Sequence, residues 1–321
     1  MTAKYAKYEI LMNWQCNQRC IFCSTGAKFG QKRTIKPLGE IKKEIRTAKR
    51  NGADTISFSG GEPTIRKDLI DSVEFAKKEG FEKIEVQSNG MMYKYPAFVE
   101  RITGAGADRF LVSIHGARAE THDFLTRTEG SFERTTQGIK NLKKAGVELR
   151  FSIVITKHNF KELVEWAEML GRFEAFSYHF NFITPIGFAK ENYAELCQKI
   201  SDTAPFIKKA VGKLDKKGLN SWVHNIYPCN LPGYEGRMSE LAEKFTFLSG
   251  PDFKVQIDKT KMDGRAKPQA CGKCKWNNLC VGPHEKYVEL FGNEEFMPVK
   301  GPQVMKGEFG VQKYGYSKRR G

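Results

Sequence analysis

The chain has 321 residues, of which 40% are hydrophobic and 28% are charged, an ordinary composition for a folded protein. Lys and Arg outnumber Asp and Glu by 53 to 37, and this net charge of +16 favours RNA or acidic peptides as partners. Lysines scattered over solvated helix faces would give the same total. The only apolar stretch near the start is too short for a signal sequence or a membrane span, so we expect a cytoplasmic protein with reduced thiols and no membrane partner.

Strand and helix patterns alternate over the first 180 residues. We expect strands at about 8–15, 55–59, 83–87, 110–113, 148–156 and 176–183, and helices at about 37–51, 66–79, 95–103, 131–145 and 160–170. Nearly every helix is followed by a glycine, which predicts βαβ units and a parallel sheet with its functional groups at the carboxyl ends of the strands. A basic helical stretch follows at about 190–217. From about 220 glycine, proline and cysteine become frequent, which places a domain boundary near 217.

Three cysteines follow the first expected strand within eight residues. Cys16, Cys20 and Cys23 are separated by three and by two residues. A cubane iron–sulfur cluster takes four thiolates, so a loop that supplies three leaves one iron open for chemistry. A zinc knuckle, a disulfide with a spare thiol, or plain buried cysteines remain alternatives, although zinc loops more often show paired C-x2-C motifs.

Small polar motifs end the next strands. Gly60, Gly61 and Glu62 end the second strand, where paired glycines permit close backbone approach and the carboxylate is an acceptor. Polar residues that end the third and fourth strands can bind hydroxyl or carboxylate groups, or form ordinary turns; these residues are Ser88, Asn89 and Ser113.

Two charged or titratable residues lie on apolar strands. His115 follows the fourth strand, and we expect a structural role for it. Arg150 lies on the fifth strand and needs an anionic partner, which is either a ligand carboxylate or a carboxylate of the protein.

A second group of cysteines lies in the last third of the chain. Cys271, Cys274 and Cys280 have the spacing C-x2-C-x5-C, and Cys229 lies upstream. Four thiolates close a metal site completely, and the spacing alone permits zinc as well as a four-iron cluster. The remaining cysteine, Cys197, is expected to be a packed free thiol.

The loop Cys16–Cys23, with Phe22 before its last cysteine, resembles the signature of the radical S-adenosylmethionine (SAM) enzymes. The resemblance implies a partial (β/α)6 barrel similar to a TIM barrel, with a [4Fe–4S] cluster and SAM as cofactors. It also implies that Cys16, Cys20 and Cys23 bind the cluster. It further implies SAM contacts, which fall at Phe22, Gly60, Gly61, Glu62, Ser88, Asn89, Ser113 and Arg150.

The C-terminal cysteines resemble the SPASM or twitch extension of the same superfamily. The resemblance implies one auxiliary [4Fe–4S] cluster bound by Cys229, Cys271, Cys274 and Cys280, because too few cysteines remain for a second. The expected organisation is a core at 1–217, an auxiliary-cluster domain at 218–300 and a flexible basic tail at 301–321.

The function that these resemblances imply is a radical SAM oxidoreductase that abstracts a hydrogen from its substrate. The leading hypothesis is the oxidative modification of a peptide, a maturase activity, with electron transfer through the auxiliary cluster and a low-potential donor of the flavodoxin or ferredoxin type. A tRNA- or nucleotide-modifying enzyme is the second hypothesis, and it rests on the net charge and on the aromatic, basic tail. A sugar dehydrogenase or epimerase and a non-enzymatic metal-binding module are the others.

Overall fold

The computed structural model describes residues 6–28, 34–241, 246–305 and 309. Nine strands of this part of the chain form one unclosed sheet in the order β7-β6-β5-β4-β3-β2-β1-β8-β9. The six expected strands are present as β1 (Lys7–Leu11), β2 (Thr55–Ser59), β3 (Lys83–Ser88), β4 (Arg109–Ser113), β5 (Glu148–Ile155) and β6 (Ser177–Phe182). All six are parallel, and they form the open α/β barrel that was expected.

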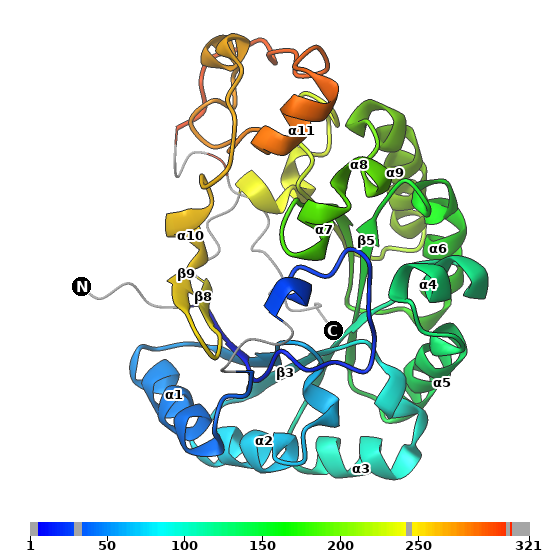
Figure 1. The fold of residues 1–321 in the computed structure, drawn as a ribbon, viewed down its shortest axis with the longest axis vertical. Helices are drawn as coiled ribbons and strands as arrows, with labels where there is room; N and C mark the ends of the chain where they lie inside the picture. Colours follow the sequence, from blue (N-terminus) through cyan, green and yellow to red (C-terminus); the bar gives the residue numbers. More distant parts are fainter. Residues whose placement is uncertain (1–5, 29–33, 242–245, 306–308, 310–321) are drawn as a thin grey trace.

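Helices follow one another around the outside of the curved sheet (Figure 1). The main ones are α1 (Leu38–Arg50), α2 (Leu69–Lys78), α3 (Pro96–Gly104), α5 (Ser131–Lys144), α6 (Leu163–Leu170) and α9 (Ile200–Asp215). Each has an apolar face that lies on the sheet; in α1 this face consists of Ile41, Ile45 and Ala48. Gly52, which follows α1, has a φ of 72°, a left-handed conformation that glycine adopts without strain.

Several elements differ from the sequence-based expectation. A further helix, α4 (Ala119–Thr126), follows β4, and the expected helical stretch at 190–217 consists of α7 (Phe188–Glu191), α8 (Tyr193–Leu196) and α9. The first strand ends at Leu11 instead of residue 15, because the chain then turns to pair with two segments: Met12 N donates to Ser59 O, and Trp14 N donates to Thr34 O.

Three strands that the sequence did not predict extend the sheet beyond residue 217. β7 (Ser221–His224) pairs in parallel with β6, and β8 (Thr246–Ser249) pairs in parallel with β1 at the other edge. β9 (Lys254–Gln256) is antiparallel to β8, and the short helices α10 (Ile257–Thr260) and α11 (Glu285–Phe291) follow. The expected boundary near 217 therefore falls between strands of one sheet, and it stays a prediction. Most of the tail at 301–321, including Tyr314–Arg320, lies outside the described residues.

Candidate functional site

Segments far apart in the sequence hold the three-cysteine loop at the carboxyl edge of the sheet. Arg19 N and Ile21 N donate to the carbonyl oxygens of Thr126 and Leu125 at the end of α4, both at 3.0 Å. Phe188 N donates to Cys23 O at 3.0 Å, and the side chain of Asn192 donates to Ile21 O at 2.9 Å. These hydrogen bonds within the protein fix the position of the loop from both sides.

Gly187 makes the contact with the loop possible. Its φ is 61°, and a Cβ at this position would lie 2.4 Å from Ser24 O and 2.5 Å from Cys23 O. Only glycine lets the two backbones approach so closely. Sequence reasoning missed this residue as part of the site; the signal was a lone glycine directly after an expected strand.

The three cysteines themselves are half-buried, and the surroundings of two of them, Cys16 and Cys20, disfavour a free thiolate. Burial, and secondarily the charge of Glu62, raises the pKa of Cys16 to about 12. Burial also raises the pKa of Cys20, followed by the effects of Cys23 and Cys16. Cys16 and Cys20 thus lose their protons only at high cost, and such thiols are suited to a cationic metal centre, which binds thiolates and releases the protons.

Several hydrogen-bond donors point at the cysteine sulfurs. Gln18 N lies 3.4 Å from Cys16 Sγ, the Thr25 hydroxyl lies 3.4 Å from Cys23 Sγ, and Asn89 Nδ2 lies 4.0 Å from Cys16 Sγ. In the described ranges no three His, Cys, Asp or Glu side chains are grouped around one point as ligands of a single metal ion. A cubane needs no such grouping, because each of its thiolates binds a different iron.

The paired glycines after β2 pack against the start of the cysteine loop. Gly60 has a φ of 133°, and a Cβ there would lie 2.5 Å from Asn13 O. A Cβ on Gly61 would lie 2.1 Å from Gln15 O. Gly61 N donates to Asn13 O, and Glu62 N donates to Gln15 O, both at 2.7 Å. The two glycines thus position the backbone that leads into Cys16.

The buried Glu62 carboxylate accepts hydrogen bonds from both the segment after β2 and the end of β3, and so links them. It accepts hydrogen bonds from Thr64 N at 3.0 Å and from the hydroxyls of Thr64 and Ser88 at 2.5 and 2.9 Å. Its other oxygen accepts from Asn89 N at 2.8 Å. Burial raises the pKa of Glu62, and these donors oppose the rise. Glu62, Ser88 and Asn89 are therefore brought together, beside the loop that carries Cys16.

Phe22 and His115 face each other where the loop meets the end of β4. Their ring centroids are 4.6 Å apart, with the ring planes at 65°. His115 is buried; its Nδ1 accepts from Val154 N at 3.2 Å, and its backbone N donates to His122 Nδ1 at 2.9 Å. These contacts correspond to the structural role expected for His115. Ser113 lies two residues earlier, in register with Ser152 of β5.

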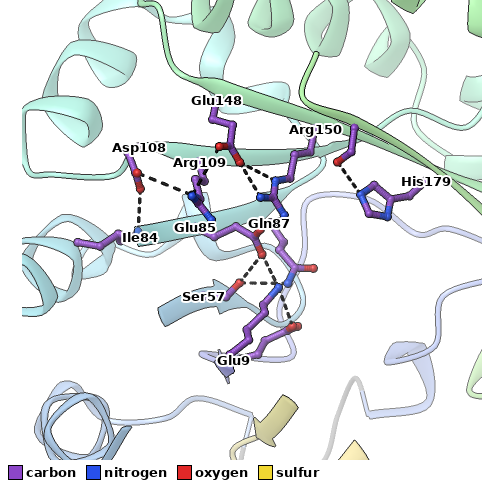
Figure 2. Close-up of polar contacts among 12 residues, drawn as sticks. Glu9, Ser57, Ile84, Glu85, Gln87, Asp108, Arg109, Glu148, Arg150 and His179 are labelled. Atoms are coloured by element: carbon purple, nitrogen blue, oxygen red, sulfur yellow. Dashed lines mark hydrogen bonds and ion pairs between the residues drawn. The ribbon is translucent and has the colours of Figure 1, made fainter. Parts of the chain in front are cut away.

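Arg150, the last of the predicted SAM contacts, lies on β5. It is the third residue of β5 and so lies near the amino end of the strand. Its guanidinium bonds Glu148 Oε1 at 2.8 and 2.6 Å and pairs with Glu85 at 3.5 Å (Figure 2). A carboxylate of the protein, the alternative that the sequence left open, is thus a partner of Arg150, and the SAM contact stays a prediction.

The four C-terminal cysteines line one small cavity. Cys229, Cys271, Cys274 and Cys280 surround it together with Trp276. Burial, and secondarily the nearby thiols, raises the pKa of Cys229 to about 12. Val299 N donates to Cys274 Sγ at 3.4 Å. The buried Nε1 of Trp276 finds no acceptor among the described residues, and a sulfide or thiolate in this cavity would provide one. The donor set thus fits a thiolate-bound group.

Cys197 lies elsewhere, buried in the core. Burial raises its pKa to about 12, and Tyr193 is the side chain that bonds it. This environment is that of the packed free thiol expected from the sequence.

A pocket of about 440 Å³ lies at the carboxyl ends of β6 and β7. Its wall includes Ile186, next to the glycine that contacts the three-cysteine loop, and Val281, next to Cys280 of the second group. Two residues of the pocket wall are thus direct sequence neighbours of residues that belong to the two cysteine sites. Its polar wall residues, which sequence reasoning missed, include His224, Glu240, Arg265 and His284.

The open parallel barrel and the cysteine loop at its carboxyl edge define an α/β half-barrel protein whose site is built from strand ends. Residues 14–170 match the family model described as Radical SAM superfamily. This part of the chain is thus a radical SAM domain, and the radical SAM superfamily uses a [4Fe–4S] cluster and SAM.

Two curated relatives match a similar part of the chain. An AdoMet-dependent heme synthase of Methanosarcina barkeri (strain Fusaro / DSM 804) is 31% identical over 191 residues, which are 57% of this chain and 53% of the relative. A probable GTP 3′,8-cyclase of Saccharolobus islandicus (strain M.14.25 / Kamchatka #1) is 28% identical over 188 residues, which are 58% of this chain and 60% of the relative. The chain spans little more than half the length of these relatives.

Solved structures share the fold over a larger part of the chain. Streptococcus suis SuiB bound to S-adenosylmethionine has a TM-score of 0.68 at 14% identity, over 92% of this chain and 76% of SuiB. SuiB bound to the precursor peptide SuiA has a TM-score of 0.62 at 14% identity, over 91% and 66%. At this identity the likeness establishes the fold alone. Of the helices in the described ranges, none is long and apolar enough to span a membrane.

Proposed function

We propose that this chain is a radical SAM oxidoreductase that removes a hydrogen atom from a peptide and passes an electron onward. The observation that carries the proposal is the fixed position of the three-cysteine loop against the Gly-Gly-Glu end of β2. When bound, the cluster and SAM supply the reducing electron and the 5′-deoxyadenosyl radical that abstracts hydrogen. The residues of the chain contribute binding and orientation.

The three thiolates of Cys16, Cys20 and Cys23 would hold the cluster and leave one iron for SAM. Backbone carbonyls near Gly60 and Gly61 would accept hydrogen bonds from the SAM ammonium group, which is a triple donor. Glu62 fixes the ends of β2 and β3 through Ser88 and Asn89 N, so these two residues are held in place to bind polar groups of SAM. Phe22 and Ser113 complete the proposed contacts.

We propose the cavity of Cys229, Cys271, Cys274 and Cys280 as the site of one auxiliary four-iron cluster. Four protein thiolates would occupy every iron, which suits electron transfer rather than substrate binding. The proposed auxiliary region at 218–300 would thus be the electron acceptor that an oxidation requires. The pocket at the carboxyl ends of β6 and β7 is the proposed substrate site.

A peptide is the proposed substrate because the pocket wall combines apolar side chains with several charged and polar ones, and because the chain is strongly basic. SuiB, which shares the fold, was crystallised with its precursor peptide SuiA. That complex is a property of SuiB, and here it serves only as support for the class of substrate.

The proposed electron donor is an acidic low-potential protein of the flavodoxin or ferredoxin type. A hollow beside Ile21 of the cysteine loop is lined by two cations, Arg127 and Lys157, by one carboxylate, Glu195, and by the exposed ring of Phe124. Positive charge around an exposed ring, directly behind the loop, suits an acidic partner that must approach the first cluster closely.

Anaerobic reconstitution tests this function. We expect about eight irons per chain, four from each cubane, and formation of 5′-deoxyadenosine from SAM with dithionite. Replacement of Cys16, Cys20 and Cys23 by Ala should halve the iron content and abolish SAM cleavage. Cys197→Ala is the matched control, because this thiol lies outside both sites, and it should change neither value. Full iron content in the triple variant, or zinc in the loop, would refute the proposal.

A further inference from the structure

One histidine in the wall of the pocket has a ring nitrogen without a partner. His284 lines the pocket at the carboxyl ends of β6 and β7 and is 9% exposed. Its Nε2 is buried and has no hydrogen-bond partner among the described residues. Leaving a buried polar nitrogen unpaired is costly, and folded proteins retain few such groups. An unpaired nitrogen in the wall of a cavity is therefore a candidate for contact with a ligand.

The backbone holds His284 directly opposite Arg265. The two residues form an isolated antiparallel bridge, and beside it Ala266 N donates to Pro283 O at 2.8 Å. The helix α11 (Glu285–Phe291) begins directly after His284. Side chains directly opposite each other in an antiparallel pair lie on the same face, and both of these side chains line the pocket. The position of the imidazole is thus set by the backbone and needs no polar partner at Nε2.

The imidazole of His284 is neutral, and its Nε2 is a hydrogen-bond acceptor. Burial, and secondarily the charge of Arg265, lowers the pKa of His284 to about 4, and a hydrogen bond with the backbone of Gly264 opposes this. A backbone group that raises the pKa of an imidazole is a carbonyl, so the ring nitrogen bonded to it carries the hydrogen. That nitrogen is Nδ1, because Nε2 has no partner among the described residues. A neutral imidazole has one N–H, so Nε2 has a free lone pair.

The neighbouring polar groups of the wall already have partners within the protein. Glu240 Oε1 accepts from Asn225 N at 2.9 Å. Arg265 donates to Tyr227 OH at 2.8 Å and to Asn225 Oδ1 at 2.9 Å. These bonds hold Glu240 and Arg265 in place, whereas His284 Nε2 is left for a group that enters the pocket.

The charge of Arg265 decides which kind of donor suits Nε2. Because this charge disfavours a proton on the imidazole, it also disfavours an ammonium or guanidinium placed at Nε2. Lys261 adds a second cation to the wall, and Glu240, Asp258 and Asp263 are carboxylates of the same wall. The preference therefore holds locally, beside Arg265. An uncharged donor, such as a hydroxyl or an amide N–H, avoids this repulsion.

We infer that His284 Nε2 accepts a hydrogen bond from an uncharged donor, a hydroxyl or an amide N–H, of the peptide that enters this pocket. The inference rests on the proposed function, in which this pocket binds a peptide, and it makes His284 a specificity-determining residue. A peptide without a donor at this point would cover Nε2 and leave it unpaired. A site built around a hydrogen bond discriminates against such a ligand.

The first test measures the tautomer of His284 in the oxidised holoenzyme labelled with ¹⁵N-histidine. The chain has six histidines, and His284→Asn assigns the two ring signals of this residue by their loss. We expect the hydrogen on Nδ1 and none on Nε2 near neutral pH. The reverse tautomer, with the hydrogen on Nε2, would overturn the inference before any peptide is added.

Three capped peptides then serve as probes: acetyl-Gly-Ser-Gly-amide, acetyl-Gly-Ala-Gly-amide and acetyl-Gly-Lys-Gly-amide. We expect the serine peptide to shift the Nε2 signal upfield, as happens when a ring lone pair accepts a hydrogen bond. A shift with the serine peptide alone identifies a hydroxyl as the donor, and an equal shift with the alanine peptide identifies a backbone amide. The largest shift with the lysine peptide, or no shift with any of the three, would overturn the inference. His158 is exposed and lies outside this pocket, so its signals should stay unchanged.

Two substitutions separate the acceptor from the ring that carries it. The amide of Asn extends only as far as Nδ1 of histidine, whereas the amide of Gln extends as far as Nε2. His284→Asn should therefore lower the affinity for the serine peptide roughly tenfold, and His284→Gln should retain most of it. Equal losses in the two variants, both with the iron content and melting temperature of the wild type, would show that His284 is only structural. Failure of the wild type to form 5′-deoxyadenosine would refute the proposed function alone, because peptide binding to the oxidised protein requires no SAM cleavage.

Discussion

Ser88 at the end of β3 donates a hydrogen bond of 2.9 Å to Glu62 at the end of β2, and both side chains are buried. The same hydroxyl accepts from Gly90 N at 3.0 Å. Ser88→Ala should therefore destabilise the protein by about 1–3 kcal/mol, because it leaves a buried donor and acceptor without their partner. It should also weaken SAM binding, since the two strand ends lose their link.

Denaturant unfolding and equilibrium binding of SAM to the reconstituted protein measure the two effects. Ser72→Ala on α2 is the control, because it removes a buried hydroxyl far from the site. Equal effects of the two substitutions on SAM affinity would contradict a specific role for Ser88.

A second prediction concerns Gly61. Because this residue has no Cβ, the end of β2 can pack against the cysteine loop. Gly61→Ala places a methyl group 2.1 Å from Gln15 O, and backbone atoms cannot move aside cheaply. We expect the loop to shift and the iron content of the first site to fall by half or more. Gly212→Ala in α9 is the control; nothing lies within 4 Å of its Cβ, and in a helix interior it should stabilise the fold by about 1 kcal/mol. Normal iron content in Gly61→Ala would show that the close approach is dispensable.

Glu85 gives a prediction about pH. Burial would raise its pKa, but Lys7 and Arg150 outweigh burial and hold it at about 2. A carboxyl whose pKa is lowered by folding stabilises the protein above its ordinary pKa of 4.5, and this stabilisation is lost as the pH falls from 4.5 through 2. The contribution is on the order of 3 kcal/mol. The free energy of unfolding, measured as a function of pH, should therefore decrease as the pH is lowered through that interval.

Arg150→Met should destabilise the protein at neutral pH by roughly 3–5 kcal/mol, because it leaves Glu85 buried with one cation fewer. The loss should shrink as the pH falls, since Glu85 then becomes neutral. Arg118→Met is the control, because its ion pair with Glu165 is exposed, and it should change little. At temperatures where Arg150→Met is folded, SAM should bind normally. A folded variant that fails to bind SAM would support the ligand role that the sequence indicated.

Trp276 allows a prediction about reduction potential. Its buried N–H lines the four-cysteine cavity and would donate to a cluster sulfur, which stabilises the more negative reduced state. Trp276→Phe should lower the potential of the auxiliary cluster by tens of millivolts, since one hydrogen bond contributes about 1 kcal/mol. Spectroelectrochemical titration measures the change. Trp166→Phe is the control, because that indole donates to Ile114 O and should leave the potential unaltered.

The sequence allowed most of the barrel to be predicted, because β1 to β6 and their helices carry clear periodic patterns. It did not reveal β7, β8 or β9, which have only three or four residues each and pair across long sequence separations. The meeting of polar strand ends was predictable because parallel strands place them at one edge, where Glu62, Ser88 and Asn89 are hydrogen-bonded to one another. The protein carboxylates around Arg150 could not be chosen over a ligand in advance, because a strand pattern does not indicate which of its residues lies near the ligand.

The pocket could not have been predicted for a related reason. His224 and Glu240 are 16 residues apart and meet only through Ser239, whose position depends on a turn without periodic signal. The contact of Gly187 with Cys23 O joins residues from opposite ends of the barrel domain. Such contacts follow from tertiary packing, and neither motif spacing nor propensity encodes them.

The pairing of β7 with β6 and of β8 with β1 has a consequence for how the protein is made. A polypeptide that ends at residue 217 would expose the hydrogen-bonding groups of both outermost strands, and bare strand edges recruit other chains into aggregates. The ribosome synthesises β7 and β8 after residue 217. The nascent N-terminal part therefore has two unpaired strand edges until these two strands have been made. Expression of the first 217 residues alone should therefore yield insoluble material, whatever the supply of iron.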